Sequence, residues 1–276
     1  MLQGKVGRKP AFSDREVITW MLAKDFIPYP GKQQFLGYIR ANHLALFPDL
    51  FQSQFNRRAQ SVRLLVEALR QDWLLELGVE NSDQFLIDTK PIPVVGYKRS
   101  KRHSDFAGSA AYGYCASRKL HYFGYKLVML TTLDGLPVLY ELAPANLGER
   151  QAAEAVLDRL LNARVIGDKG FLGEEWQAQI AQQTGNRIMP PKRTNQKVQH
   201  PPDFERLSNS LREHIEGVFH EIQNTGRNLE RLWAKTVVGL ATRVISKITS
   251  HLRKHLLRLR CGINVQTFQA LPDFAF

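Results

Sequence analysis

Two aspartates in this chain lie in apolar segments, where a carboxylate needs a partner. Asp88 lies within FLIDTKPIPV, a run of β-forming residues closed by prolines that predicts a strand over residues 85–94. A buried carboxylate is costly unless a cation or hydrogen bonds compensate its charge. We therefore interpret Asp88 as a metal ligand held by a sheet. The alternative is an aspartate that caps a turn at the end of the strand.

The second aspartate, Asp168, follows the apolar residues of RVIGDKGF (164–171), which predict a strand that ends in a glycine-bounded turn. Ligand sites in α/β folds gather at the carboxyl ends of strands, which favours a role in binding. The alternative is an aspartate that only forms the turn before glycine.

A third acid comes from a predicted helix over residues 206–224, which offers Glu213, Glu216 and Glu221. At about 100° per residue, Glu216 shares a face with Arg212, whereas Glu213 and Glu221 point elsewhere. The alternative is an ordinary surface ion pair between Arg212 and Glu216. The apolar stripe of this helix consists of Leu211, Ile215, Val218 and Ile222.

Together, Asp88, Asp168 and Glu216 fit one chemistry. Hard cations such as Mg²⁺ prefer oxygen ligands and leave coordination positions for phosphate and water. Two such ions about 4 Å apart activate the attacking oxygen and stabilise the leaving oxygen of a phosphodiester. We therefore predict that the three acids are catalytic and bind a pair of Mg²⁺ or Mn²⁺ ions. Neither aspartate has a cysteine or histidine beside it that would favour zinc.

The charge of the chain indicates a polyanionic partner. The 38 Lys and Arg residues outnumber the 26 Asp and Glu residues, giving a net charge of +12 that is spread over the chain. A folded protein this basic most often binds nucleic acid; a ribosome-associated or merely basic soluble protein is the alternative. The side chains that we expect at DNA phosphates are Lys98, Arg99, Lys101 and Arg102 in a basic loop, Lys126 on a predicted strand, and Lys192 and Arg193 after the last strand.

Hydrophobic periodicity divides the chain into a helical N-terminal module, residues 1–80, which we interpret as DNA-binding, and an α/β catalytic domain with C-terminal helices, residues 81–276. The predicted helices of the module run from the capping box Ser13-x-x-Glu16 to Phe26 and over residues 33–45 and 60–77. Five strands are predicted over residues 85–94, 121–132, 136–143, 164–171 and 187–193, with helices over 149–162, 174–183, 206–224 and 229–259. Three antiparallel strands, followed by two that join through helical crossovers, predict a mixed five-stranded sheet flanked by helices and a long C-terminal helix.

Other features carry less information. The basic residues before and along the third predicted helix indicate either a DNA-facing or a solvated face: Arg57, Arg58, Arg63 and Arg70. His251 and His255, one helical turn apart, could bind a metal, but we favour a solvated basic face. Two cysteines cannot form a disulfide framework, which predicts a reducing compartment. No apolar run approaches the ~18 residues of a membrane span, and no apolar segment of a secretory signal follows the basic N-terminus.

Several blocks of the sequence resemble the insertion-sequence family 982 of bacterial DDE transposases. These blocks are GRKPAFSDREVIT, FNRRAQSV, FLIDTKPIPV, HYFGYKLVMLTTLDGLPV, VIGDKGF and LREHIEGVF. The resemblance as a whole covers about Gly7 to Arg260. The resemblance implies a ribonuclease H-like catalytic domain with a D, D, E triad at Asp88, Asp168 and Glu216. Members of this family usually carry more helical sequence before the GRKP block, so the resemblance also implies an N-terminus shorter than theirs.

Arg212 and Glu216 match the R-x3-E part of the Y-R-E-K signature of insertion-sequence family 4 relatives. The resemblance therefore places Arg212 among the DNA-binding residues. Asn209 and Gln223 occupy the tyrosine and lysine positions of that signature, so the DNA contacts usually made there are not implied for this chain.

The family resemblance implies a bacterial cytoplasmic, nucleoid-associated enzyme that cuts and joins double-stranded DNA. Hydrolysis at a terminal repeat of the element would free a 3′-OH, which would then attack target DNA. A homo-oligomer on DNA is expected, and no membrane partner. The alternatives are a ribonuclease H-like nuclease that only hydrolyses, and an inactive or domesticated DNA-binding derivative.

Overall fold

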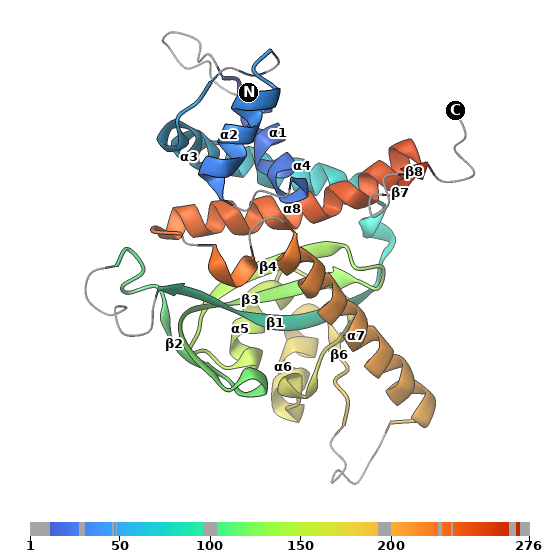
Figure 1. Cartoon of the computed structure of the whole chain (residues 1–276). Helices are drawn as coiled ribbons and strands as arrows, with labels where there is room; N and C mark the ends of the chain where they lie inside the picture. The colour runs from blue at the N-terminus through green and yellow to red at the C-terminus, as the bar shows by residue number, and fades with distance from the viewer. Residues whose placement is uncertain are drawn as a thin grey trace.

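The structure is a computed structural model that describes residues 12–27, 31–45, 47, 49–95, 104–192, 200–225, 228–232, 234–264 and 269–270. A helical module lies above a long helix, α8, which lies across a mixed β-sheet (Figure 1). This α/β arrangement is ribonuclease H-like, as predicted. The described α-helices are α1 (Asp14–Ala23), α2 (Lys32–Asn42), α3 (Gln52–Ser61), α4 (Arg63–Glu76), α5 (Glu149–Leu157), α6 (Glu174–Thr184), α7 (Pro202–Asn224) and α8 (Val237–Cys261).

The main sheet contains six of the described strands. Its order is β2-β3-β1-β5-β6, and β4 pairs with the part of β3 that β2 leaves uncovered. The early strands pair antiparallel, whereas β1, β5 and β6 are parallel neighbours, as predicted. These strands are β1 (Gln84–Val95), β2 (Ala111–Cys115), β3 (Leu120–Thr132), β4 (Pro137–Pro144), β5 (Arg164–Ile166) and β6 (Arg187–Ile188); β7 (Ile263–Asn264) and β8 (Gln269–Ala270) form a separate pair.

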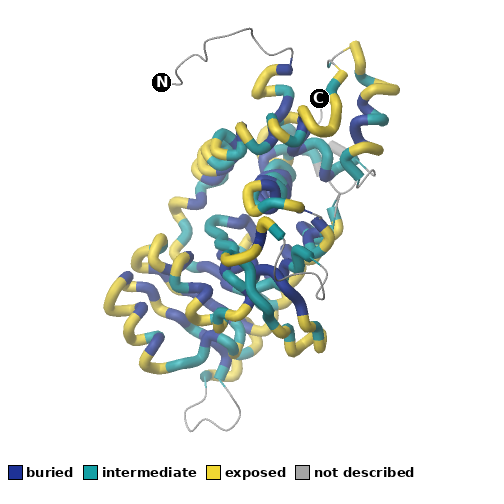
Figure 2. Tube along the Cα trace, turned by 90° about the vertical axis from the view of Figure 1, so that its left-hand side faces the viewer, coloured by how far each residue is buried: buried dark blue, intermediate teal, exposed yellow. Residues whose placement is uncertain are grey.

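Helices cover both faces of the sheet, because side chains alternate between its faces along each strand. In β1, Phe85 and Ile87 pack with the apolar residues of α5 and α6, whereas Leu86 and Ile92 pack with those of α7 and α8. The buried positions therefore run through the sheet and along α8 (Figure 2). The central strand is thus fixed from both sides.

The helical module packs on α8 and on the sheet. Ile245 of α8 lies inside the apolar core of the module. The hydroxyl of Ser246 donates to the carbonyl of Met21 (2.8 Å), and that of Ser250 donates to the carbonyl of Leu22 (3.0 Å). Arg70, only 1% exposed, donates to the carbonyls of Pro137 and Val138 in β4. The expectation that Arg70 lies on a DNA-facing or solvated surface is therefore wrong, because its guanidinium closes the interface between module and sheet.

The structure corrects several expected elements. The strand β2, within the segment between the first two predicted strands, was not predicted. Residues 52–76 form two helices with a break at Val62, rather than one helix from residue 60. The long helix begins at Val237, not at residue 229, because the side chain of Thr236 caps it by accepting from the N–H of Gly239. The capping box of Ser13 and Glu16 is present as predicted.

Candidate active site

Asp88 lies where the central strand loses one neighbour. The strand β1 pairs with β3 along most of its length, but its pairing with β5 ends at Leu86 and Ile166. Alternation places Asp88 on the same side of the sheet as Leu86, the side covered by α7. The backbone N–H of Thr89 donates to Asp88 Oδ1 (2.7 Å) and orients the carboxylate.

The last pair between β1 and β5 is Leu86 with Ile166. Asp88 and Asp168 each follow their member of this pair by two residues. Asp168 caps a single turn, because its Oδ1 accepts from the N–H of Gly170 (2.7 Å). The preceding Gly167 is tightly enclosed: a Cβ there would lie 2.6 Å from the ring of Phe171. The GDKG segment therefore holds Asp168 in a fixed turn beside β1.

Glu216 comes from α7, which crosses the same side of the sheet. The neighbouring residues Ile215 and Phe219 are buried against the sheet, whereas Glu216 is exposed at the edge of that contact. Arg212 lies one turn before it and lines the same cleft. Burial of the apolar residues of α7 against the sheet therefore fixes the position of Glu216 at the edge of the contact.

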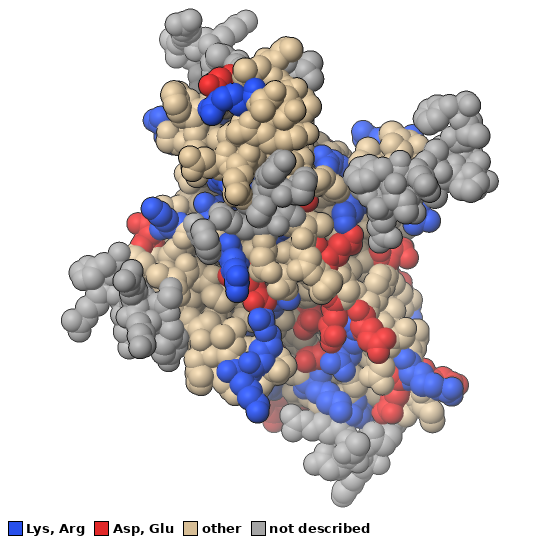
Figure 3. Space-filling view, viewed as in Figure 1, with Lys and Arg blue, Asp and Glu red and all other residues tan. Residues whose placement is uncertain are grey.

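One cleft of about 610 Å³ brings these side chains together. Its walls carry Asp88, Asp168 and Glu216, and also Glu149, which sequence analysis had not singled out. We call this cleft, lined by Asp88, Glu149, Asp168 and Glu216, the acid cleft. On the face seen in Figure 1, Asp and Glu side chains gather right of the middle, next to Lys and Arg side chains (Figure 3). The cations on the walls of the acid cleft are Lys90, Arg118, Lys126 and Arg212.

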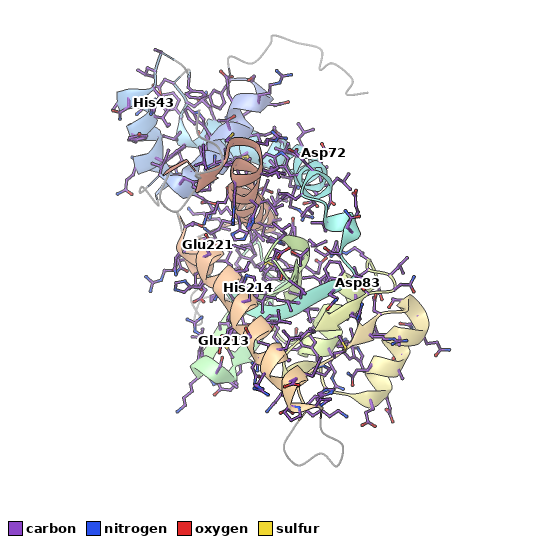
Figure 4. The ribbon with its side chains drawn as sticks, turned by 90° about the vertical axis from the view of Figure 1, so that its right-hand side faces the viewer. His43, Asp72, Asp83, Glu213, His214 and Glu221 are labelled. Atoms are coloured by element: carbon purple, nitrogen blue, oxygen red, sulfur yellow. The ribbon has the colours of Figure 1, made fainter. Side chains whose placement is uncertain are left out.

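The two other glutamates of α7 do not line the acid cleft. Glu213 is exposed, and it lies beside His214 along α7 in Figure 4. Glu221 lies farther along the helix and pairs with Lys254 and His251 of α8. Of the three candidate glutamates on this helix, the structure brings Glu216 alone into the cleft with Asp88 and Asp168.

The electrostatics of the acid cleft favour a bound cation. Burial raises the pKa of Asp88 to about 7; the hydrogen bond from Thr89 opposes this rise, and the carboxylates of Asp168, Glu149 and Glu216 add to it. Burial also raises the pKa of Glu149, and Asp168 adds to that rise. Negative charges are thus held together at a cost that a cation would relieve.

The donor set fits a hard divalent ion, because it consists of carboxylate oxygens. Within the part of the chain that the structure describes, no group of three or more His, Cys, Asp or Glu side chains is arranged so that it could hold a metal ion. The acids therefore surround the cleft without converging on one point.

Glu149 is the functional candidate that sequence analysis missed. It is the first residue of α5, and the hydroxyl of Thr89 donates to its Oε1 (3.4 Å). A Cβ on Gly170 would lie 1.6 Å from Glu149 Oε2, so the turn that holds Asp168 closes directly onto this carboxylate. The sequence offered only an acid at a helix start, which is a common stabilising feature. Its place beside Asp88 arises from the fold.

The predicted phosphate contacts divide into groups. Lys126 and Arg212 line the acid cleft, and Lys126 donates to the carbonyl of Leu147. Lys192 lines a different hollow, beside His200, so the structure does not bring it to the acids. The residues Lys98, Arg99, Lys101, Arg102 and Arg193 lie outside the described residues.

Two further cations in the acid cleft are anchored by one glutamate. Glu230 pairs with Arg118 and also with Lys90 (3.8 Å). Lys90 lies over the ring of Phe219, 5.7 Å from its centroid, and its burial lowers its pKa. These contacts hold both cations at the wall of the acid cleft.

The expectation that His251 lies on a solvated basic face is wrong, because the structure buries this histidine. Its side chain is 4% exposed and lies 3.3 Å from the carbonyl of Gly135 and 3.4 Å from Glu221. His255 is half-buried beside it. The apolar positions of α8 and the turn between β3 and β4 enclose His251, which explains why its charged surroundings in the sequence were misleading.

The fold and the acid cleft define a ribonuclease H-like domain whose central strand presents Asp88 to a cleft lined by further carboxylates. A family model described as the transposase DDE domain matches residues 81–263, which is most of the chain. The chain therefore belongs to the DDE transposases. Its function is that of a transposase, and its partner is DNA. No curated protein and no solved structure was found to match it.

Proposed function

We propose that this transposase cleaves the ends of an insertion sequence and joins them to target DNA at the acid cleft, as a member of insertion-sequence family 982. The observation that carries the proposal is that one cleft is lined by Asp88 from within β1, Asp168 from the turn after β5 and Glu216 from α7. Membership in the transposase DDE domain family supports the D, D, E assignment.

Asp88, Asp168 and Glu216 would hold a pair of Mg²⁺ or Mn²⁺ ions through their carboxylate oxygens. Such a pair activates the attacking oxygen and stabilises the leaving oxygen of a phosphodiester. Glu149 adds a fourth carboxylate at the same place and keeps Thr89 and the Asp168 turn in contact. The acids thus provide the negative site at which a phosphodiester and its counter-ions are held.

The cations of the acid cleft orient the DNA backbone. Lys126 and Arg212 lie on its walls beside the acids, and Lys90 is held in place by Glu230. Their charges compensate phosphate oxygens and keep the scissile bond in line with its attacker.

Two chemical steps follow at this one site. In the first, a water oxygen bonds to phosphorus at the element end and the bond from phosphorus to O3′ breaks, which leaves a 3′-OH on the element. In the second, that 3′ oxygen bonds to a target phosphorus and a target P–O3′ bond breaks, so the element is joined without external energy. The same carboxylates and cations serve both steps because both displace an oxygen at phosphorus.

We also propose that the protein acts as a homo-oligomer on DNA, in the bacterial cytoplasm at the nucleoid, since both ends of an element must be joined to one target. Light scattering of the complex with an element-end duplex should give two or more chains per complex. No helix among the residues described here is long and apolar enough to span a bilayer.

A strand-transfer assay tests the proposed function. A labelled element-end duplex is mixed with supercoiled plasmid and the wild-type protein, with Mg²⁺, Mn²⁺, Ca²⁺ or EDTA. The proposal predicts labelled plasmid with Mg²⁺ or Mn²⁺, and binding without efficient cleavage with Ca²⁺, whose looser coordination misplaces the attacking oxygen. Cleavage without joining would indicate a plain nuclease, and binding without either product an inactive derivative. Full cleavage in EDTA would contradict the metal-dependent mechanism.

A further inference from the structure

The helix that carries Glu216 is packed closely along only its second half. Of residues 202–214, which form the first half of α7, Ser208 alone is buried. From Ile215 onward the apolar residues of α7 pack on the sheet, and the helix ends beside α8 (Figure 1). Glu216 lies one residue after the start of this packed half and is itself exposed. The contacts of the packed half therefore decide where Glu216 points.

Glu221 ties the packed half of α7 to α8. Its carboxylate accepts a hydrogen bond from Lys254 Nζ and lies 3.4 Å from Nδ1 of the buried His251. Burial acts to raise the pKa of Glu221, but the hydrogen bond and charge of Lys254 lower it below its usual value. The side chains are 16% exposed for Lys254 and 34% for Glu221, so salt screens this pair less than a surface pair.

The turn between β3 and β4 closes on the same stretch of α7. A Cβ on Gly135 would lie 2.8 Å from Val218, and the carbonyl of Gly135 lies 3.3 Å from His251 Nε2. The packed half is thus held between this turn, the sheet and α8. Apolar contacts are not directional, so they leave the helix free to make small rotations. The charge-assisted hydrogen bond between Lys254 and Glu221 is directional and opposes such rotations.

Glu216 and Glu221 are linked through the geometry of the helix. Five residues separate them, which is about 7.5 Å along the axis and roughly 140° around it. Glu216 therefore lines the acid cleft while Glu221 meets α8. A rotation of α7 moves both side chains, so a contact that fixes Glu221 also fixes Glu216. Such precision matters, because a misplacement of about 1 Å can cost ~100-fold in rate.

We infer that Glu221 and Lys254 are positioning residues: the ion pair between them sets where α7 presents Glu216 to the acid cleft, and thereby how tightly the cleft binds divalent ions. The inference rests on the proposed function, because it takes Glu216 as a metal ligand. Neither Glu221 nor Lys254 lines the cleft, so both act through the helix and not through contact with metal or DNA.

Mn²⁺ binding to the protein without DNA, measured by electron paramagnetic resonance, tests this role without relying on cleavage. Lys254→Met should weaken binding severalfold, less than the ~10–100-fold typical of a partner that contacts a metal ligand directly. Lys254→Arg keeps the charge and the donor and should bind like the wild type. Arg258→Met, which removes an exposed cation one turn later on α8, is the matched control. If unfolding in EDTA shows that Lys254→Met does not fold, Glu221→Gln takes its place, because it breaks the ion pair but keeps a hydrogen-bond acceptor.

Equal Mn²⁺ affinities in Lys254→Met and Arg258→Met would overturn the positioning role. A wild-type protein that bound no Mn²⁺ would instead contradict the proposed metal site itself, so the two failures are distinguishable.

A double-mutant cycle asks whether Lys254 acts through Glu216. In a protein that already carries Glu216→Gln, adding Lys254→Met should cause no further loss of Mn²⁺ affinity or of cleavage rate in Mg²⁺. The affinity for an element-end duplex in EDTA should stay unchanged throughout the cycle. A merely structural role would lower the active fraction in either background. Losses that add in the double variant would therefore overturn the inference.

Discussion

Asp88 combines burial, like-charged neighbours and a single backbone hydrogen bond, and its pKa of about 7 is the result. A shift of one pKa unit corresponds to about 1.4 kcal/mol. The rise from 3.8 therefore corresponds to a cost of up to roughly 4 kcal/mol when this carboxylate is ionised in the metal-free protein. A cation bound beside Asp88 would remove this cost, because it stabilises the ionised carboxylate.

Asp88→Asn should therefore stabilise the metal-free protein. The folded state binds a proton at Asp88 more readily than the unfolded state, so the stability cost is absent below about pH 4 and is complete above about pH 7. Urea unfolding in EDTA should show a larger gain for Asp88→Asn at pH 8 than at pH 5. Added Mg²⁺ should stabilise the wild type more than the variant. An equal gain at both pH values would contradict the assigned pKa.

The roles of individual residues could be predicted only where the sequence marks them. Asp88 and Asp168 stand out because each follows an apolar run, and Glu216 because its face of the helix differs from that of Glu213. Glu149 carries no such mark, since an acid in a first helical turn is ordinary. Its place in the acid cleft depends on how α5 meets β1, which local patterns do not encode.

At the scale of elements, α7 and α8 are tied together by a buried charged cluster. His251 of α8 lies against Glu221 of α7 and the carbonyl of Gly135 in the β3–β4 turn. Burial lowers the pKa of His251 to about 4, although Glu221 opposes this shift. Lys254 also pairs with Glu221, and His255 lies beside His251.

This cluster predicts a loss of stability in acid. Between about pH 6.5 and pH 4 the unfolded chain binds a proton at His251 that the folded protein does not, so stability falls as pH falls. The loss from this group is up to about 3 kcal/mol. His251→Gln keeps a donor for Gly135 and should reduce the dependence, whereas His214→Gln, at an exposed residue of α7, should not. Denaturant unfolding at pH 5 and pH 7 compares the two variants. If the free energy of unfolding falls equally in both between pH 7 and pH 5, His251 is not the group that causes the loss.

Most strands and helices could be predicted because their apolar periodicity is strong and their ends carry turn or cap signals. The DG turn at Gly135, with its positive φ of 84°, joins β3 to β4 as predicted. The strand β2 was missed because AYGYC is short and contains glycine. The break at Val62 was missed because neither proline nor glycine marks it.

At the scale of the whole molecule, a buried ion pair couples the module to α8. Asp25, which follows α1, lies 3.8 Å from Lys247 Nζ, and both side chains are almost inaccessible. Lys247 also donates to the carbonyl of Thr225 at the end of α7. The module, α7 and α8 thus meet at one charged side chain. The predicted boundary at residue 80 remains a prediction, although the matched family region begins at residue 81.

Lys247→Met should destabilise the protein by about 3 kcal/mol or more, because it removes the cation that pairs with the buried Asp25. Asp25→Asn/Lys247→Met should recover much of that loss, since it removes both buried charges. Thermal or urea unfolding followed by two probes, one in the module and one in the sheet, measures both effects. A small effect of Lys247→Met on stability would show that the module does not depend on this pair.

The central claim is that Glu216 completes a catalytic triad with Asp88 and Asp168. The most direct measurement compares Glu216→Gln with Glu213→Gln, which makes the same change three residues earlier on α7 and outside the acid cleft. Cleavage of an element-end duplex with Mg²⁺ is followed under single-turnover conditions, and binding is measured in parallel. Glu216→Gln should lose more than about 100-fold in rate, since residues that merely support metal ligands cost up to that much.

Glu213→Gln should cleave within about twofold of wild type, as expected for a surface substitution, and both variants should bind the duplex. Cleavage by Glu216→Gln at the rate of Glu213→Gln would contradict the account.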